Sequence, residues 1–277
     1  DATKEPVKYL WYVGDFASFN QNCQDTTRKV AKVLTAAGVD FGIMGKKEKS
    51  AGNDVRRTGE EGLFEVLAEQ NIEAIEKCKF EEIFTTDPHT FNTLKNEYPN
   101  KGGNYPVKHY STLLLELIQS GDIELKKKLD IKATYHDPCY LGRYNGIYDD
   151  PRDVMKLCGI DLVEMPRNKE NSFCCGAGGG RVWLPDHDDM TQRPSENRIA
   201  EAVAVGVRHF TVACPKDMTM YADAVKTSGN EDNMAVKDMV DFVLEAMDLP
   251  EPIMEETASS DPNEEVSTEP QSEGLDL

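Results

Sequence analysis

Short apolar runs alternate with longer amphipathic stretches along most of the chain, which is the pattern of strands separated by helices. In the first half, we expect strands at 7–13, 41–44 and 82–86, and helices at 26–37, 63–77 and 91–98. In the second half, we expect strands at 131–136, 161–165 and 209–213, and helices at 152–157, 193–205, 217–225 and 234–247. This alternation predicts parallel, doubly wound α/β units.

The two halves of the chain also resemble each other in sequence. Three blocks recur in the same order: YVGDFASFN (12–20) with YHDPCYLGR (135–143), VLTAAGVDFGIMGKKEKSAGN (33–53) with VMKLCGIDLVEMPRNKENSFCCGAG (154–178), and IFTTDPHTFNTL (83–94) with FTVACPKDMTMY (210–221). The offset is nearly constant, since Asp15 precedes Cys139 by 124 residues and Asp87 precedes Cys214 by 127. We therefore expect two tandem Rossmann-like α/β repeats with parallel sheets, and a site at the carboxyl ends of strands.

The C-terminal segment differs in composition from the two repeats. We assign the first repeat to residues 1–128, the second to 129–249, and an acidic disordered tail to 250–277. The tail contains nine Asp or Glu and no Lys or Arg, and its Pro and Ser content is typical of disorder. Such a tail either keeps the protein soluble or contacts a partner.

Charge and hydropathy exclude several classes of partner. The chain of 277 residues has a formal net charge of −19, which argues against binding nucleic acid or docking on anionic lipid. No run approaches the roughly 18 apolar residues that a membrane span needs, and no secretory signal is recognisable. The chain begins with Asp1, as in a processed chain or a piece of a longer polypeptide. We expect a cytoplasmic location, or the cytoplasmic face of a membrane through partners.

Seven cysteines are candidates for chemistry: Cys23, Cys78, Cys139, Cys158, Cys174, Cys175 and Cys214. Their number is odd and no export signal is present, so metal binding or redox chemistry is favoured over a disulfide framework. Cys23, Cys78 and Cys158 lie outside the repeated motifs, and we expect them to be small core residues.

The other four cysteines, Cys139, Cys174, Cys175 and Cys214, belong to the motifs of the second repeat. Thiolates are soft ligands that suit iron–sulfur clusters and zinc. Adjacent side chains in extended backbone point to opposite faces, so the pair at 174 and 175 suits several irons better than one tetrahedral zinc. The spacing still leaves three interpretations open: an iron–sulfur cluster, a zinc site, or buried thiols without a metal.

A run of glycines follows the adjacent cysteines. We assign Gly176 and Gly178 to the cofactor-binding residues, because glycine lets the backbone approach a bulky ligand and leaves amides free to donate to sulfur. The run GAGGGR also resembles a phosphate-binding loop. A dinucleotide fingerprint requires a strand before its glycines and a helix after them. Here the glycines follow cysteines, so a nucleotide site is disfavoured.

The motifs of the second repeat resemble a known family. HDPCYLGRYNGIYDDPR (136–152), NSFCCGAGGGRVW (171–183) and TVACPKDM (211–218) are similar to the cysteine-rich CCG domain family. This family includes the B and D subunits of heterodisulfide reductase, and iron–sulfur oxidoreductases that accept electrons from electron-transfer flavoprotein. It also includes subunits of glycolate, lactate and glycerol-3-phosphate oxidation systems. The resemblance covers roughly residues 8 to 226 and points to the C-terminal part of a D-subunit-like protein.

The resemblance implies one iron–sulfur cluster of the [4Fe-4S] type, non-cubane in some family members, bound by five cysteines. Carried over to this chain, Cys139, Cys174, Cys175 and Cys214 match ligand positions. Asp217 occupies the fifth position, because CPKD replaces the CxxC of the family. Asp217 either ligates iron or begins a helix, where the helix dipole favours a carboxylate.

In the first repeat, the family's ligand positions hold residues other than cysteine. They are Asp15, Ser50, Ala51, Asp87 and Thr90. We therefore expect no cluster in the first repeat, which has kept the fold and lost the cofactor.

Four further residues of the second repeat are candidates for the site. His136 either hydrogen-bonds a cluster sulfur or a substrate, or only packs against its neighbours. Arg181 either offsets the negative charge of a cluster or pairs with a surface Asp. Tyr140 and Arg143 share the loop of Cys139.

Three functions remain open. The first is an electron-transfer component of a membrane-associated redox complex, between a flavoprotein or ferredoxin-like donor and a quinone-reactive membrane component or thiol/disulfide acceptor. An acidic surface would suit a basic patch on such a partner. The second is direct reduction of a disulfide at the cluster, which the loss of the first-repeat cluster disfavours. The third is a structural component braced by a cluster or zinc.

Overall fold

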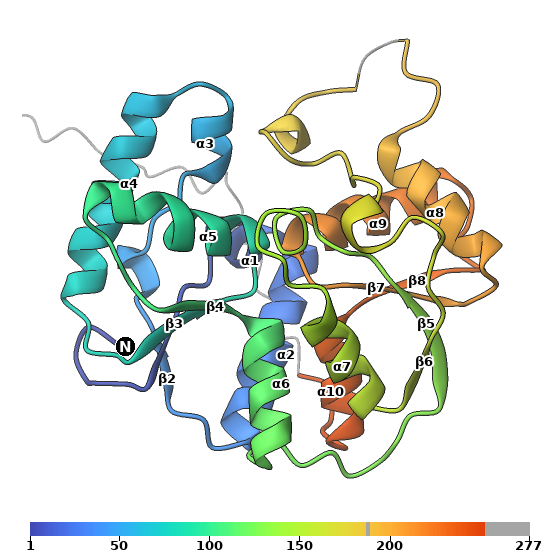
Figure 1. Ribbon diagram of the computed structural model, residues 1–277, viewed down its shortest axis with the longest axis horizontal. Helices are drawn as coiled ribbons and strands as arrows, with labels where there is room; N and C mark the ends of the chain where they lie inside the picture. The colour runs from blue at the N-terminus through green and yellow to red at the C-terminus, as the bar shows by residue number, and fades with distance from the viewer. Residues whose placement is uncertain (187–188, 253–277) are drawn as a thin grey trace, which may run out of the picture.

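The computed structural model describes residues 1–186 and 189–252 and contains two four-stranded sheets (Figure 1). The first sheet has the order β2-β1-β3-β4 and the second has the order β6-β5-β7-β8. The strands are β1 Tyr9–Trp11, β2 Phe41–Ile43, β3 Glu82–Thr85, β4 Val107–His109, β5 Ile131–Tyr135, β6 Ile160–Leu162, β7 His209–Val212 and β8 Ala235–Asp238. Neighbouring strands in both sheets are parallel, which confirms the predicted α/β fold of two tandem repeats.

Helices follow the strands in the same order in both repeats. They are α1 Asp15–Phe19, α2 Gln21–Ala36, α3 Asn53–Arg57, α4 Glu61–Glu76, α5 Pro88–Asn92, α6 Tyr110–Ser120, α7 Asp149–Leu157, α8 Pro194–Ala204, α9 Pro215–Thr227 and α10 Met239–Ala246. None of the helices in the described ranges is long and apolar enough to cross a membrane. The predicted acidic tail lies outside the described residues from position 253 onward.

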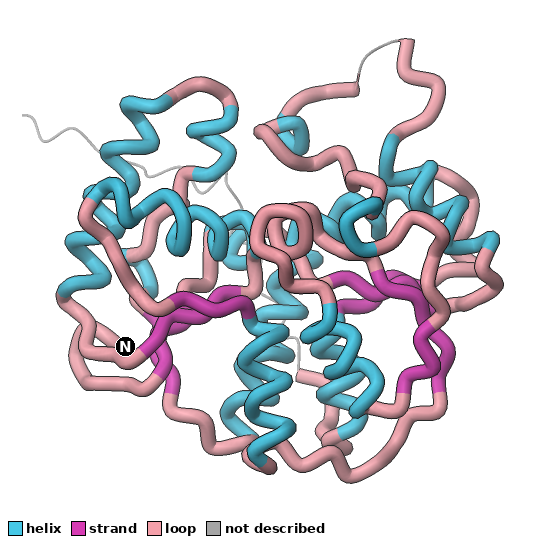
Figure 2. Tube along the Cα trace, in the orientation of Figure 1, coloured by secondary structure: helices cyan, strands magenta, loops and turns pink. Residues whose placement is uncertain are grey.

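Four helices lie between the two sheets and join the repeats. In Figures 1 and 2, α2 and α6 of the first repeat stand beside α7 and α10 of the second, with a sheet on either side. One apolar core runs through this layer, from Trp11 of the first sheet to Tyr135 of the second and Phe242 of α10. Lys29 of α2 also pairs with Asp241 of α10 at 2.7 Å. The continuous core fixes the two repeats relative to each other.

One predicted element is wrong in part. The helix expected at 234–247 is a strand, β8, followed by the shorter helix α10. Asp238 makes the break, because its carboxylate accepts a hydrogen bond from the amide of Val240 at 2.9 Å. Asp241 returns a bond by accepting from the amide of Asp238 at 2.8 Å, which completes a capping box. The helix therefore begins at Met239, and the residues before it pair with β7.

The sequence prediction also omits β4 and α6. They belong to a fourth repeated block, since VKHYSTLLLEL (107–117) resembles VKDMVDFVLEA (236–246). Each copy is a short edge strand, a polar capping residue and an apolar helix. His109 caps α6 by accepting from the amide of Ser111, as Asp238 caps α10.

Candidate metal centre

The motif cysteines of the second repeat lie on loops that follow three neighbouring strands. Cys139 lies in the loop after β5, Cys174 and Cys175 lie in the loop after β6, and Cys214 lies between β7 and α9. Because β5 pairs with both β6 and β7, the carboxyl ends of the three strands meet at one edge of the sheet. Topology alone therefore gathers these four residues.

Cys139 and Cys175 each interact with Cys174 through their sulfur atoms. The thiols of Cys139 and Cys175 both donate toward the sulfur of Cys174, which lowers the pKa of Cys174. The same donation, together with burial, raises the pKa of Cys139 and of Cys175. The amide of Gly176 also donates to Cys174 Sγ at 3.3 Å, and the amide of Ala177 donates to Cys175 Sγ at 3.4 Å. These donors favour a thiolate at Cys174, the form that binds metal.

Asp217, in the first turn of α9, joins Cys214 to this group. Its carboxylate contacts the thiols of Cys175 and Cys214, and burial raises its pKa to about 7. Its Oδ2 atom is buried and has no hydrogen-bond partner among the described residues. The nearest cation-forming group, His136 Nε2, lies 3.6 Å away, which is too long for a hydrogen bond. Buried polar atoms are normally paired, so this unpaired oxygen is a candidate ligand atom.

The spread of the donor atoms suits a cluster better than a single ion. Two thiolates on one tetrahedral zinc, each bound at about 2.3 Å, lie about 3.8 Å apart. Within residues 1–186 and 189–252, no three of the four motif sulfurs lie within 4.8 Å of one another. Four thiols and an unpaired carboxylate oxygen, spaced more widely than one ion allows, fit a multi-iron cluster.

His136 lies behind the cysteines in the second repeat. Its ring accepts from Arg198 Nε at 3.4 Å and lies 3.2 and 3.3 Å from the hydroxyl of Tyr221. Burial, followed by the charge of Arg198, lowers its pKa well below the usual value. Within the described residues, the hydrogen bonds of His136 thus go to side chains that pack around it, and none goes to a cysteine sulfur.

The remaining candidates near the cysteines have structural partners. Arg181 forms an ion pair with Asp186 at 2.8 Å, in agreement with the expectation that it pairs with a surface Asp. Arg143 donates to the carbonyl oxygen of Ser172 at 2.6 Å and so holds the loop before Cys174. The hydroxyl of Tyr140 accepts from Arg57 Nε at 3.0 Å, across the boundary between the repeats.

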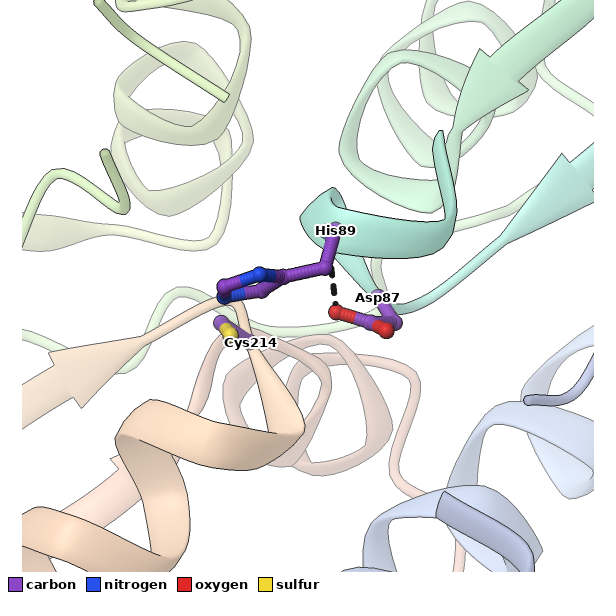
Figure 3. Close-up of side chains that lie close together, drawn as sticks. All are labelled: Asp87, His89 and Cys214. Atoms are coloured by element: carbon purple, nitrogen blue, oxygen red, sulfur yellow. Dashed lines mark hydrogen bonds between the residues drawn. The ribbon is translucent and has the colours of Figure 1, made fainter. Parts of the chain in front are cut away.

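The first repeat contributes residues to the same site that the sequence analysis did not single out as functional. A ring nitrogen of His89, a carboxylate oxygen of Asp87 and the sulfur of Cys214 lie within 4.8 Å of one another (Figure 3). Lys216 of α9 donates to both carboxylate oxygens of Asp54 in α3, at 2.7 and 2.8 Å. Burial, followed by the positive charge of Lys216, lowers the pKa of His89 to about 3. The available signal was the repeat itself, because DPH at 87–89 aligns with CPK at 214–216.

Asp87, which stands where the second repeat has Cys214, caps a helix. Its Oδ1 accepts from the amide of His89 at 3.0 Å, and its Oδ2 accepts from the amide and hydroxyl of Thr90 at 3.3 and 2.9 Å. Cys214 is the N-cap residue of α9 but makes no side-chain cap bond. The same position therefore caps a helix with its side chain in the first repeat, whereas in the second repeat it holds a thiol that makes no capping bond. That the first repeat binds no cluster stays a prediction.

The three cysteines outside the motifs are buried. Cys78 and Cys158 lie in apolar clusters. Cys23, in α2, lies 3.1 Å from the carbonyl oxygen of Pro215 and 3.4 Å from the hydroxyl of Thr219. It therefore packs the first repeat against the start of α9.

The fold and the site define a two-repeat α/β protein with a cysteine-lined centre at the strand ends of the second repeat. Comparison with known families agrees with this description on both repeats. The chain belongs to the CCG cysteine-rich domain family, whose model matches residues 12–95 and 133–218.

Three relatives carry informative names. The chain is 40% identical over 241 residues to the probable iron-sulfur-binding oxidoreductase FadF of Bacillus subtilis, covering 87% of this chain and 34% of that protein. It is 37% identical over 246 residues to the EtfAB:quinone oxidoreductase of Syntrophomonas wolfei, with the same two coverages of 87% and 34%. It is 32% identical over 257 residues to the D subunit of the dihydromethanophenazine:CoB–CoM heterodisulfide reductase of Methanosarcina mazei, covering 89% and 60%. The chain thus spans about a third of the first two relatives.

Proposed function

We propose that this chain is the iron–sulfur electron-transfer part of a larger redox complex. It holds one [4Fe-4S] cluster in its second repeat, ligated by Cys139, Cys174, Cys175 and Cys214. The observation that carries the proposal is the convergence of these four thiols from three separate loops. Asp217 is the further ligand, because its buried Oδ2 lies among the sulfurs without a partner in the described part of the chain.

The chain's own residues determine how the cluster is held and reached. The cluster supplies one-electron redox chemistry when bound. The amide of Gly176 donates to the Cys174 sulfur, and Gly178 lies in the same loop, next to His89. Cys174 is exposed, whereas Cys175 and Cys214 are buried. Electrons therefore exchange with a partner docked over Cys174, where the distance is shortest.

The names of the relatives suggest the partners. One relative is named as an EtfAB:quinone oxidoreductase and another as part of a heterodisulfide reductase. For this chain we propose a flavoprotein or ferredoxin-like donor, and an acceptor that is either a quinone-reactive membrane component or a thiol/disulfide couple. The net charge of −19 suits a basic docking patch on these partners. The complex would lie at the cytoplasmic face of a membrane.

We propose that the repeats divide between residues 128 and 129, in the connection from α6 to β5, and that residues 250–277 form a separate tail. The apolar core shared by the two repeats argues that they fold together.

Metal analysis of anaerobically purified protein tests the proposal. We expect iron and acid-labile sulfide, with an EPR signal that disappears or changes in Cys174→Ser. The matched control is Cys158→Ser, because Cys158 is fully buried in the apolar core, and this variant should keep both iron and signal. Stoichiometric zinc without sulfide would refute the redox function.

Direct disulfide reduction is the second candidate, and the exposed position of Cys174 favours it. A substrate sulfur could reach the site from this side. Adding disulfides to the reduced protein separates the two functions, because rapid reoxidation supports disulfide chemistry and its absence supports electron relay alone.

A further inference from the structure

His89 belongs to the first repeat but lies in the candidate cluster site of the second. It follows β3 in the first turn of α5, and its side chain is buried. The ring lies over the sulfur of Cys214 in Figure 3, and the ligand atoms of the two residues are within 4.8 Å of each other. A nitrogen and a sulfur bound to one metal ion at about 2.0 and 2.3 Å lie at most about 4.3 Å apart, so the two residues are close to the separation that a shared ion requires.

A chain of hydrogen bonds determines which ring nitrogen of His89 carries the proton. The hydroxyl of Thr93 donates to the carbonyl oxygen of His89 at 3.0 Å, so its lone pair accepts from Asn53 Nδ2 at 3.3 Å. The amide oxygen of Asn53 therefore faces His89 Nδ1, 3.1 Å away, and Nδ1 must donate to it. The lone pair of the neutral ring is then on Nε2. Metal-binding histidines are held in the same way, by a hydrogen bond from the nitrogen that does not bind.

The ring of His89 is packed between residues of the second repeat. The ring of Tyr140, the residue after Cys139, packs against it with centroids 4.4 Å apart. Gly178 lies on another side, where a Cβ atom would stand 3.8 Å from His89 Cε1. An imidazole held in one orientation with its lone pair on Nε2 is a good ligand for iron.

The neighbouring Asp87 is a poorer ligand than His89. Both of its carboxylate oxygens already accept hydrogen bonds from the first turn of α5. We propose that His89 is a nitrogen ligand, which the first repeat provides to the cluster at the iron that binds Cys214. This assignment rests on the proposed function. Because imidazole is neutral, His89 adds a ligand to the centre without adding negative charge.

Hyperfine spectroscopy with isotope-labelled histidine tests the assignment. The full chain is prepared with and without ¹⁵N-histidine, and its cluster is poised in the EPR-active one-electron state. Pulsed EPR should show a nitrogen coupling of the size of a directly bonded ligand, and this coupling should change with the isotope. Iron and sulfide present without such a coupling would overturn the assignment and leave the proposed function intact. Absence of iron and sulfide would overturn both.

Variants identify the histidine. His89→Gln should lose the nitrogen coupling. His209→Gln should retain it, because His209 lies at the amino end of β7, whereas the cysteines follow the carboxyl ends of the strands. A coupling that persists in His89→Gln would overturn the assignment. Should His89→Gln fail to fold, the labelled wild-type protein still decides the matter, because a missing coupling there is sufficient to refute a nitrogen ligand.

Discussion

Asp137 joins the two loops that carry Cys139 and Cys174, and its replacement gives a sharp test of the site's architecture. Its carboxylate accepts from Arg152 Nη1 at 2.6 Å and from Nη2 at 2.8 Å, and both side chains are almost completely buried. Its Oδ2 also accepts from the amide of Lys169 at 2.7 Å, and its carbonyl oxygen accepts from the hydroxyl of Ser172 at 3.1 Å.

Asp137→Asn removes the negative charge and one of the acceptors while keeping the shape. Breaking a buried ion pair by neutralising one partner costs about 3–5 kcal/mol, because the other charge remains buried. Arg152 keeps a second carboxylate partner, Glu164 at 2.6 Å. We therefore expect a loss of stability at the lower end of this range, about 3 kcal/mol. In a chain of this size, each kcal/mol lowers Tm by about 2–4 °C, which gives a fall of about 6–12 °C.

The assay is anaerobic thermal unfolding followed by circular dichroism at one scan rate, with iron per chain measured in parallel. The control is Asp153→Asn in α7, because Asp153 pairs with Lys156 at 3.0 Å and both side chains are about half exposed. An exposed pair contributes less than about 1 kcal/mol, so Tm should barely change. If the two variants lowered Tm equally, the buried pair would not be what holds the cysteine loops.

Two further predictions concern other buried charges. Asp54→Asn leaves the ammonium of Lys216 buried without its partner and should destabilise the protein by about 3 kcal/mol. Adding Lys216→Met should restore most of the lost free energy of unfolding, measured with urea. A double variant no more stable than the single one would contradict this reasoning.

Burial raises the pKa of Asp238 to about 7, above its unfolded value of about 3.9. The stabilisation from the protonated form is therefore complete below about pH 4 and is lost as the pH rises through about 7. As the pH rises from about 4 to about 7, the Tm of Asp238→Asn should therefore increase relative to that of the wild type, and a difference that is constant over this range would refute the shift.

The sequence predicts those parts of the site that depend on local pattern. Apolar runs locate the strands, and the rule that ligands bind at strand ends explains why Cys139, Cys175 and Cys214 meet. The helix prediction fails at Asp238, because apolar residues continue at helical spacing across a capping residue that ends a strand. Short edge strands such as β4 contain too few residues to show a period of two.

Contacts between the repeats could not be predicted, because they depend on how four helices pack. The salt bridge from Asp54 to Lys216 and the contact from His89 to Cys214 join residues more than 100 positions apart. No pattern of neighbouring residues in the sequence predicts these two contacts. They exist because α2, α6, α7 and α10 share one core, which places α3 and the loop after β3 against the loop after β7.

This arrangement explains why a repeat that lacks the family's cysteines remains useful. The two repeats are alike, so their equivalent loops, DPH after β3 and CPK after β7, face each other at the boundary. Lys216 of the second repeat occupies the position that corresponds to His89. Lys216 contacts Asp54 of the first repeat, and His89 contacts Cys214 of the second. Because the first-repeat loop has no cysteine at the motif positions, it is free to cover the candidate centre of the second repeat. Asp87 closes its own helix, Asp54 neutralises Lys216, and His89 supplies a neutral nitrogen beside Cys214. The first repeat therefore lines one side of the site. Substitutions of these first-repeat residues should alter the cluster's spectrum, although all four motif cysteines lie in the second repeat.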